Sequence, residues 1–301
     1  MDVFLQIKKE GRPHWVRRFF AGEKIEHAEI EKYQAKGLGE FWIEREKVKG
    51  FSKTLLSRLH QRAQETLSGG EGSIKEAEEV FTSIVEITQK MGVKGQMVTL
   101  CEGWMRLLAK DCMTASDSDV RDWWKRLTED PSLDFHYRLV RLTSLLCTQQ
   151  IMLTDWKSKE EQAQKLNGVA FFADMHLSKP EWIHLRAPAD LEGLSANDKI
   201  AVAGHAAYAA QKLRDIPFVT KDIAILVAQH HGHLQGDWLP ERVSVTVSPL
   251  ALLYAACEEM AYVCLRSPES SPKEIHAKLL SRHKDTALRK HLEQMPKIFG
   301  W

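Results

Sequence analysis

Residues 227–240, VAQHHGHLQGDWLP, place three histidines, His230, His231 and His233, at the end of an apolar run. Each histidine gives up apolar contact there, and a buried imidazole needs a hydrogen-bond partner or a metal ion to offset the cost of losing water. The segment alone fits both packed histidines and metal ligands. Metal binding is favoured over packing if further histidines, aspartates or glutamates also lie in apolar helical segments.

Further residues of the ligand type do lie in or beside apolar helical stretches: His136 in DFHYRLVRLTSLL, Asp174 in AFFADMHLSKP, His205 in KIAVAGHAAYAAQKL, and Glu258 and Glu259 in LLYAACEEMAYV. A single histidine such as His205, among alanine, valine and glycine, is more often a satisfied core residue than a ligand. A buried carboxylate such as Asp174 is costly unless it is paired or metal-bound. Imidazoles and carboxylates together suit iron, manganese or zinc-like ions.

The elements that must position these residues are mostly helical. Nearly every segment from residue 133 onward predicts helix, without a convincing strand pair or a glycine-rich phosphate loop. Residues 2–48 predict a small α/β unit, with strands at DVFLQI, HWVRRFFAG and EFWIER and a helix at EHAEIEKYQAKG. Helices follow from residue 51, interrupted by the linker SGGEGS, and their Met, Leu and Trp stripe indicates a helical core or a dimer surface.

Composition narrows the class of protein. The chain has 301 residues and a net charge of +1, which argues against binding of a nucleic acid polymer. Its five cysteines form no CxxC pair, so buried free thiols in a reducing cytosol are expected. Because no signal-peptide core and no apolar run of membrane-spanning length is visible, we expect a cytoplasmic protein without membrane contact.

From residue 133 to about residue 299, the order and spacing of these residues resembles the HD superfamily of metal-dependent phosphohydrolases, and specifically its HD-GYP branch. That branch hydrolyses cyclic di-GMP at a two- or three-metal site. Its LLHDIGK motif looks like FFADMHL, in which Asp174 is kept while Ala173 and Leu177 replace the histidine and the lysine. Its HHE..DG.GYP motif aligns without gaps with HHGHLQGDWLP, so the GYP triplet reads Trp238, Leu239 and Pro240.

The resemblance implies a fold and a set of metal ligands. The fold is mainly α, with an HD-type helical bundle domain over residues 131–301, preceded by the α/β unit (residues 1–50) and a helical linking or dimerisation region (residues 51–130). Asp174 is the implied catalytic residue and bridges two divalent ions, for which iron or manganese is expected. One ion takes His136, Asp174 and Glu259, with Glu258 one register away, and the other takes Asp174, His205, His230 and His231. His233 has no ligand role in the family pattern.

The departures from the family pattern weaken the implied chemistry. Ala173 removes a ligand from the first ion, Leu177 removes a lysine that contacts phosphate, and Leu239 removes a tyrosine near the substrate. The sequence therefore predicts a degenerate HD-GYP-like protein that binds one or two ions and cyclic di-GMP or a related nucleotide, with a regulatory or sensing role and weak or no hydrolysis. An active metal-dependent cyclic di-GMP phosphodiesterase is the alternative, and a metal-free interaction scaffold is a further one. The sequence also leaves open whether the chain binds a protein partner and whether it forms a homodimer.

Overall fold

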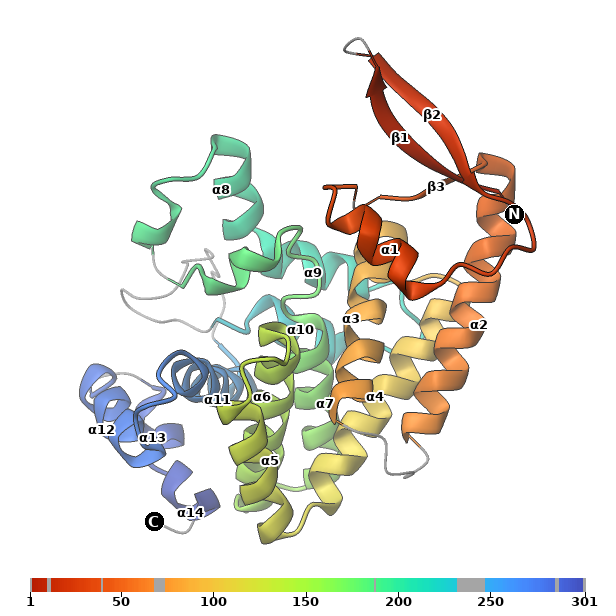
Figure 1. Cartoon of the computed structure of the whole chain (residues 1–301). Coiled ribbons are helices and arrows are strands. Elements are labelled where there is room, and N and C mark those ends of the chain that lie inside the picture. Colours follow the sequence, from red (N-terminus) through yellow and green to blue (C-terminus); the bar gives the residue numbers. More distant parts are fainter. Residues whose placement is uncertain are drawn as a thin grey trace. The chain divides into compact units, whose positions relative to one another are not determined.

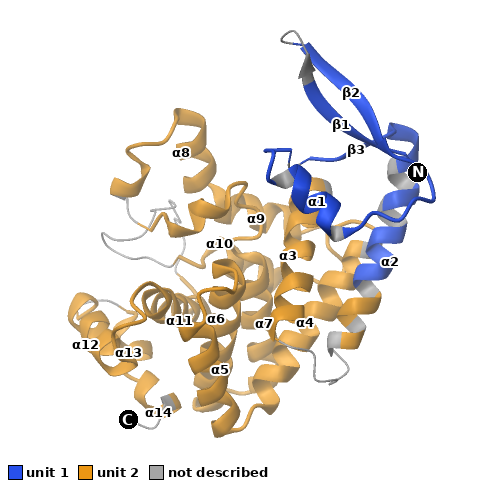
Figure 2. Ribbon diagram, viewed as in Figure 1, with its two compact units in different colours: residues 1–60 blue, residues 61–301 orange. Residues whose placement is uncertain are grey.

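The structure, a computed structural model, describes residues 2–9, 12–38, 40–67, 74–186, 188–231, 247–284 and 287–299. It separates into two compact units, Met1–His60 and Gln61–Trp301 (Figure 2). The linker SGGEGS, His233 and the triplet at residues 238–240 lie outside the described residues. The predicted boundary between the linking region and the HD-type domain, near residue 130, stays a prediction.

The first unit contains a three-stranded sheet with the order β2-β1-β3. Strand β1 (Val3–Lys9) pairs antiparallel with β2 (Arg12–Phe19) on one side and with the short β3 (Trp42–Ile43) on the other. Helix α1 (His27–Gln34) precedes Gly37, whose φ of 74° favours glycine, as at the ends of many helices. The predicted α/β unit is thus confirmed in its element types.

The rest of the described chain is helical (Figure 1). The helices are α2 (Val48–Leu67), α3 (Ile74–Met91), α4 (Gln96–Thr114), α5 (Asp117–Glu129), α6 (Phe135–Met152), α7 (Lys159–Phe172), α8 (Ala196–Ala203), α9 (His205–Leu213), α10 (Lys221–Ala228), α11 (Pro249–Arg266), α12 (Pro272–Arg282), α13 (Arg289–Leu292) and α14 (Met295–Phe299). Short 3-10 helices are η1 (Arg45–Lys47), η2 (Pro180–His184) and η3 (Pro188–Leu191). Among the described residues, strands occur only in the first unit, which confirms the predicted mainly α fold.

Helix α6 lies at the centre of the second unit and contacts α4, α5, α7 and α11. Helices α6 and α11 are buried along most of their length, because apolar side chains cover several of their faces rather than one stripe. The Met, Leu and Trp stripe of α4 and α5 is also buried, as Trp104 and Trp124 show. These side chains therefore form core.

Helix α7 packs closely against α4 and α10, and Gly168 allows this approach. A Cβ at this position would lie 2.9 Å from Met105 Sδ and 3.2 Å from Ile223 Cδ1. Such distances are too short for an unstrained side chain, so only glycine fits without a shift. The close packing fixes the end of α7, after which Asp174 follows.

Side-chain caps define where several of the helices next to the candidate site begin. The Asp134 carboxylate accepts a hydrogen bond from Tyr137 N at the start of α6, and the Thr220 and Ser248 hydroxyls cap α10 and α11 in the same way. The five cysteines are free and buried, as expected. Within the part of the chain that the structure describes, no helix combines the length and the apolar character needed to cross a membrane.

Candidate metal centre

The four residues that the family resemblance assigns to one ion all lie near helix ends. Asp174 lies two residues beyond the end of α7, His205 is the first residue of α9, and His230 and His231 follow α10. Helices α9 and α10 contact each other, so the start of the first lies near the end of the second. The Gln229 side chain accepts a hydrogen bond from Ser248 N at 2.9 Å and thereby ties the end of α10 to the start of α11.

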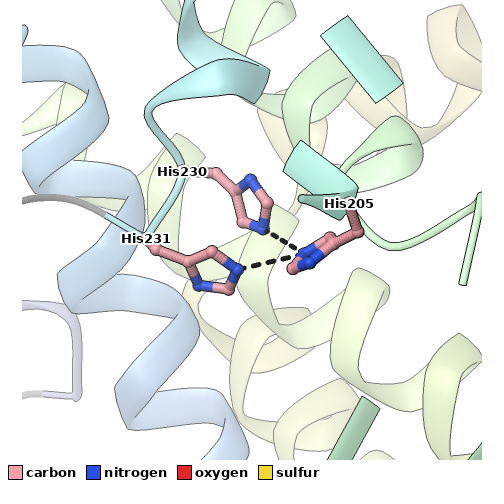
Figure 3. Close-up of side chains that lie close together, drawn as sticks. All are labelled: His205, His230 and His231. Carbon is pink, nitrogen blue, oxygen red and sulfur yellow. Dashed lines mark hydrogen bonds between the residues drawn. The ribbon is translucent and has the colours of Figure 1, made fainter. Parts of the chain in front are cut away.

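The three imidazoles turn their Nε2 atoms toward one another (Figure 3). His205 Nε2 lies 3.3 Å from His230 Nε2 and 3.0 Å from His231 Nε2. Asp174 Oδ1 lies 3.4 Å from His205 Nε2 and 3.9 Å from His230 Nε2. An ion with bonds of about 2.0–2.2 Å holds neighbouring ligand atoms about 3–3.5 Å apart. The observed spacing is therefore close to that of ligands around a single ion.

The opposite ring nitrogens explain why the Nε2 atoms are available. His205 Nδ1 lies 2.6 Å from Val202 O, and His230 Nδ1 lies 2.7 Å from Val227 O. A carbonyl oxygen only accepts, so each Nδ1 carries a hydrogen, and a ring in its neutral form then presents a lone pair at Nε2. In the neutral form of both rings, the lone pairs of His205 and His230 would face each other at 3.3 Å without a hydrogen to share, whereas a cation between them would satisfy both.

Burial keeps these rings in the neutral form that binds metal. It lowers the pKa of His230 to about 4, and the neighbouring His205 lowers it further, while Asp174 opposes both effects. Burial likewise holds the pKa of His231 well below its usual value, with His230 and His205 acting in the same direction. At neutral pH these two rings are uncharged, so no proton has to leave them before an ion binds.

Asp174 has a second neighbour, which sequence reasoning missed. Its Oδ2 lies 3.7 Å from Arg186 Nη2, and Arg186 Nη1 lies 3.3 Å from Glu258 Oε1. Burial alone would raise the pKa of Asp174, but contact with His205 and the charge of Arg186 hold it well below its usual value. Burial raises the pKa of Glu258 to about 7, although Arg186 acts against this rise.

The two glutamates of α11 point to different surroundings. Glu258 faces Arg186, whereas Glu259 Oε1 lies 2.9 Å from Arg282 Nη1 and its Oε2 lies 2.7 Å from His283 Nε2. Successive residues of a helix are rotated by about 100°, so only one of the pair can face a given site. The family pattern implies Glu259 as the ligand, with Glu258 one residue earlier, and of the two it is Glu258 that Arg186 links to Asp174.

His136 lies within electrostatic reach of Asp174 but is not a member of the group formed by the three imidazoles. The Nε2 of His136 is buried and has no hydrogen-bond partner among the described residues, and its ring lies edge-on to Phe81 at 5.2 Å. Burial lowers the pKa of His136, while the charge of Asp174 raises it. Ala173 and Leu177 are buried apolar residues.

No family model matches the sequence, and no curated protein matches it. A solved structure described as Bd1817, a HDG"Y"P protein from Bdellovibrio bacteriovorus, is similar to this chain with a TM-score of 0.55 and a sequence identity of 16%. The similarity covers 100% of this chain and 94% of that chain. At this identity the similarity concerns the fold, and it confirms the predicted HD-type helical architecture. The chain therefore has the fold of an HD-GYP protein.

Proposed function

We propose that this chain is a degenerate HD-GYP-like protein that binds a divalent metal ion through Asp174, His205, His230 and His231. The observation that carries the proposal is the convergence of three buried Nε2 atoms, whose mutual distances include 3.0 and 3.3 Å. Packed histidines without an ion normally pair a donor with an acceptor, and the contact between His205 and His230 lacks a donor in the neutral state. Iron or manganese suits this mixture of imidazole and carboxylate.

The proposed role is regulatory or sensory, with weak or no hydrolysis. A bound divalent ion would supply positive charge that polarises a water molecule or a phosphate oxygen. Efficient phosphodiester hydrolysis needs further groups that stabilise the transition state, and binding needs fewer of them. Ala173 and Leu177 are apolar and buried where the resemblance places a ligand histidine and a lysine that contacts phosphate.

Cyclic di-GMP or a related nucleotide is the candidate ligand. This part of the proposal is supported by the sequence resemblance and by the fold shared with an HD-GYP protein. A cytoplasmic location, a protein partner and a homodimer stay predictions.

The test starts with protein purified without chelators. We expect inductively coupled plasma mass spectrometry to find iron or manganese in the wild type and little in His205→Ala. Isothermal titration calorimetry should then detect cyclic di-GMP binding to the metal-loaded wild type, while chromatography of the nucleotide shows little or no turnover. Rapid turnover would favour the phosphodiesterase, and a well-folded wild type that takes up no metal would favour the metal-free scaffold.

A further inference from the structure

The Asp174 carboxylate lies between the imidazole group and the Arg186 guanidinium. Its Oδ1 faces the imidazoles, at 3.4 Å from His205 Nε2, and its Oδ2 faces Arg186, at 3.7 Å from Nη2. The other terminal nitrogen of Arg186 lies 3.3 Å from Glu258 Oε1. The guanidinium thus joins two buried carboxylates, as a metal ion bridging them would.

We propose that the Arg186 guanidinium takes the place of a second metal ion, so that the centre holds a single ion at the imidazole group. This inference rests on the proposed function, because it assumes an ion bound by His205, His230 and His231. It assigns to Arg186 the role of setting how many ions the centre accepts.

Several contacts hold Arg186 in this position. Its Nε donates a hydrogen bond to Ile183 O at 3.1 Å, and its guanidinium carbon lies 4.7 Å from the centre of the Tyr262 ring. The Tyr262 hydroxyl in turn donates to His184 O at 3.3 Å. Only 13% of the Arg186 side chain is exposed. The arginine is therefore packed against η2 and α11 rather than extended into solvent.

The charge of Arg186 is permanent, because a guanidinium does not lose its proton in proteins. A divalent ion that approached Asp174 Oδ2 and Glu258 from the same side would meet this charge at close range in a poorly hydrated site. The guanidinium already lies between the Asp174 and Glu258 carboxylates. A second ion would first have to displace the arginine.

The experiment counts bound Mn²⁺ in the full-length wild type, Arg186→Met and Arg186→Lys. Each protein is expressed with Mn²⁺, stripped of loosely bound ions and measured by mass spectrometry and electron paramagnetic resonance. We expect one magnetically isolated ion per chain in the wild type and in Arg186→Lys, which keeps the positive charge. In Arg186→Met we expect two ions per chain with a spin-coupled spectrum.

The outcomes separate this inference from the proposed function. Two ions in the wild type, or one ion in a folded Arg186→Met, overturns the inference and leaves the metal-binding function standing. No ion in the wild type overturns both. Because loss of Arg186 leaves buried carboxylates without compensation and can prevent folding, Ala173→His is measured in parallel. It adds an imidazole next to Asp174 but keeps Arg186, so we expect one ion, and a second ion would contradict the inference.

Discussion

Replacing His205 by alanine should abolish most of the stability that a metal ion gives to this protein. His205 lies near all three of the other proposed ligands, since its Nε2 lies 3.0 Å from His231 Nε2, 3.3 Å from His230 Nε2 and 3.4 Å from Asp174 Oδ1. Substitution of residues that merely hydrogen-bond to a metal ligand weakens metal binding about 10–100-fold. Loss of this central ligand should weaken it by about 100-fold or more.

The expected size of the effect follows from binding linkage. At a free metal concentration about 100 times the dissociation constant, the ion stabilises the wild type by about 2.7 kcal/mol. For a unit of this size, about 1 kcal/mol shifts the melting temperature by about 2–4 °C, so the wild-type shift should be about 5–11 °C. In His205→Ala the same metal concentration should contribute at most about 0.4 kcal/mol, or about 1–2 °C.

The assay is differential scanning calorimetry of each protein with Mn²⁺ and with a chelator. The comparison is made within each variant, because His205→Ala also loses the contact of Nδ1 with Val202 O, worth about 1 kcal/mol with or without metal. His276→Ala is the matched control: His276 is buried and bonded through Nε2 to Leu292 O, outside the imidazole group. The reasoning is refuted if His205→Ala keeps the full metal-dependent shift, or if His276→Ala loses it.

Three further predictions concern the surroundings of the centre. Glu259→Gln should cost about 1–3 kcal/mol of unfolding free energy, because it weakens the contact with Arg282, yet leave metal content unchanged; a fall in metal content would restore Glu259 as a ligand. The pKa of His230 is lowered to about 4 from 6.5, so unfolding takes up a proton between these values and metal-free protein should lose stability as pH falls through this window. In His230→Gln, the unfolding free energy measured by urea titration should fall by up to about 3 kcal/mol less over this pH range than in the wild type. An unchanged pH dependence would contradict the claim that His230 is a buried, neutral ring. Gly168→Ala should destabilise the protein by at most about 1 kcal/mol, because the Met105 and Ile223 side chains must move to admit the new Cβ while alanine favours the helix by about 1 kcal/mol, and a loss above about 3 kcal/mol would show that these side chains cannot move.

The sequence contained enough to predict the helical fold and the members of the imidazole group. The helical spacing and the glycine and polar caps predict the elements, and the structure confirms most of them. His205, His230 and His231 could be grouped because their order matches the family pattern, although 25 residues separate the first two. Spacing along the chain did not provide their geometry, which depends on the contact between α9 and α10.

The parts that could not be predicted depend on side-chain direction and on irregular backbone. Choosing between Glu258 and Glu259 needs the rotation of α11 about its axis, and an alignment that is uncertain by one residue changes that direction by about 100°. Arg186 lies between η2 and η3, outside any regular element or motif, so nothing in its neighbourhood marked it as a partner of Asp174.

The most direct test of the central claim is an anomalous diffraction map of crystals grown from protein purified without chelators, recorded at the absorption edges of iron and manganese. We predict a single peak within bonding distance of Nε2 of His205, His230 and His231 and of one oxygen of Asp174. A well-ordered map without a peak at these atoms, or with a peak elsewhere in the chain, would contradict the claim that they form a metal centre.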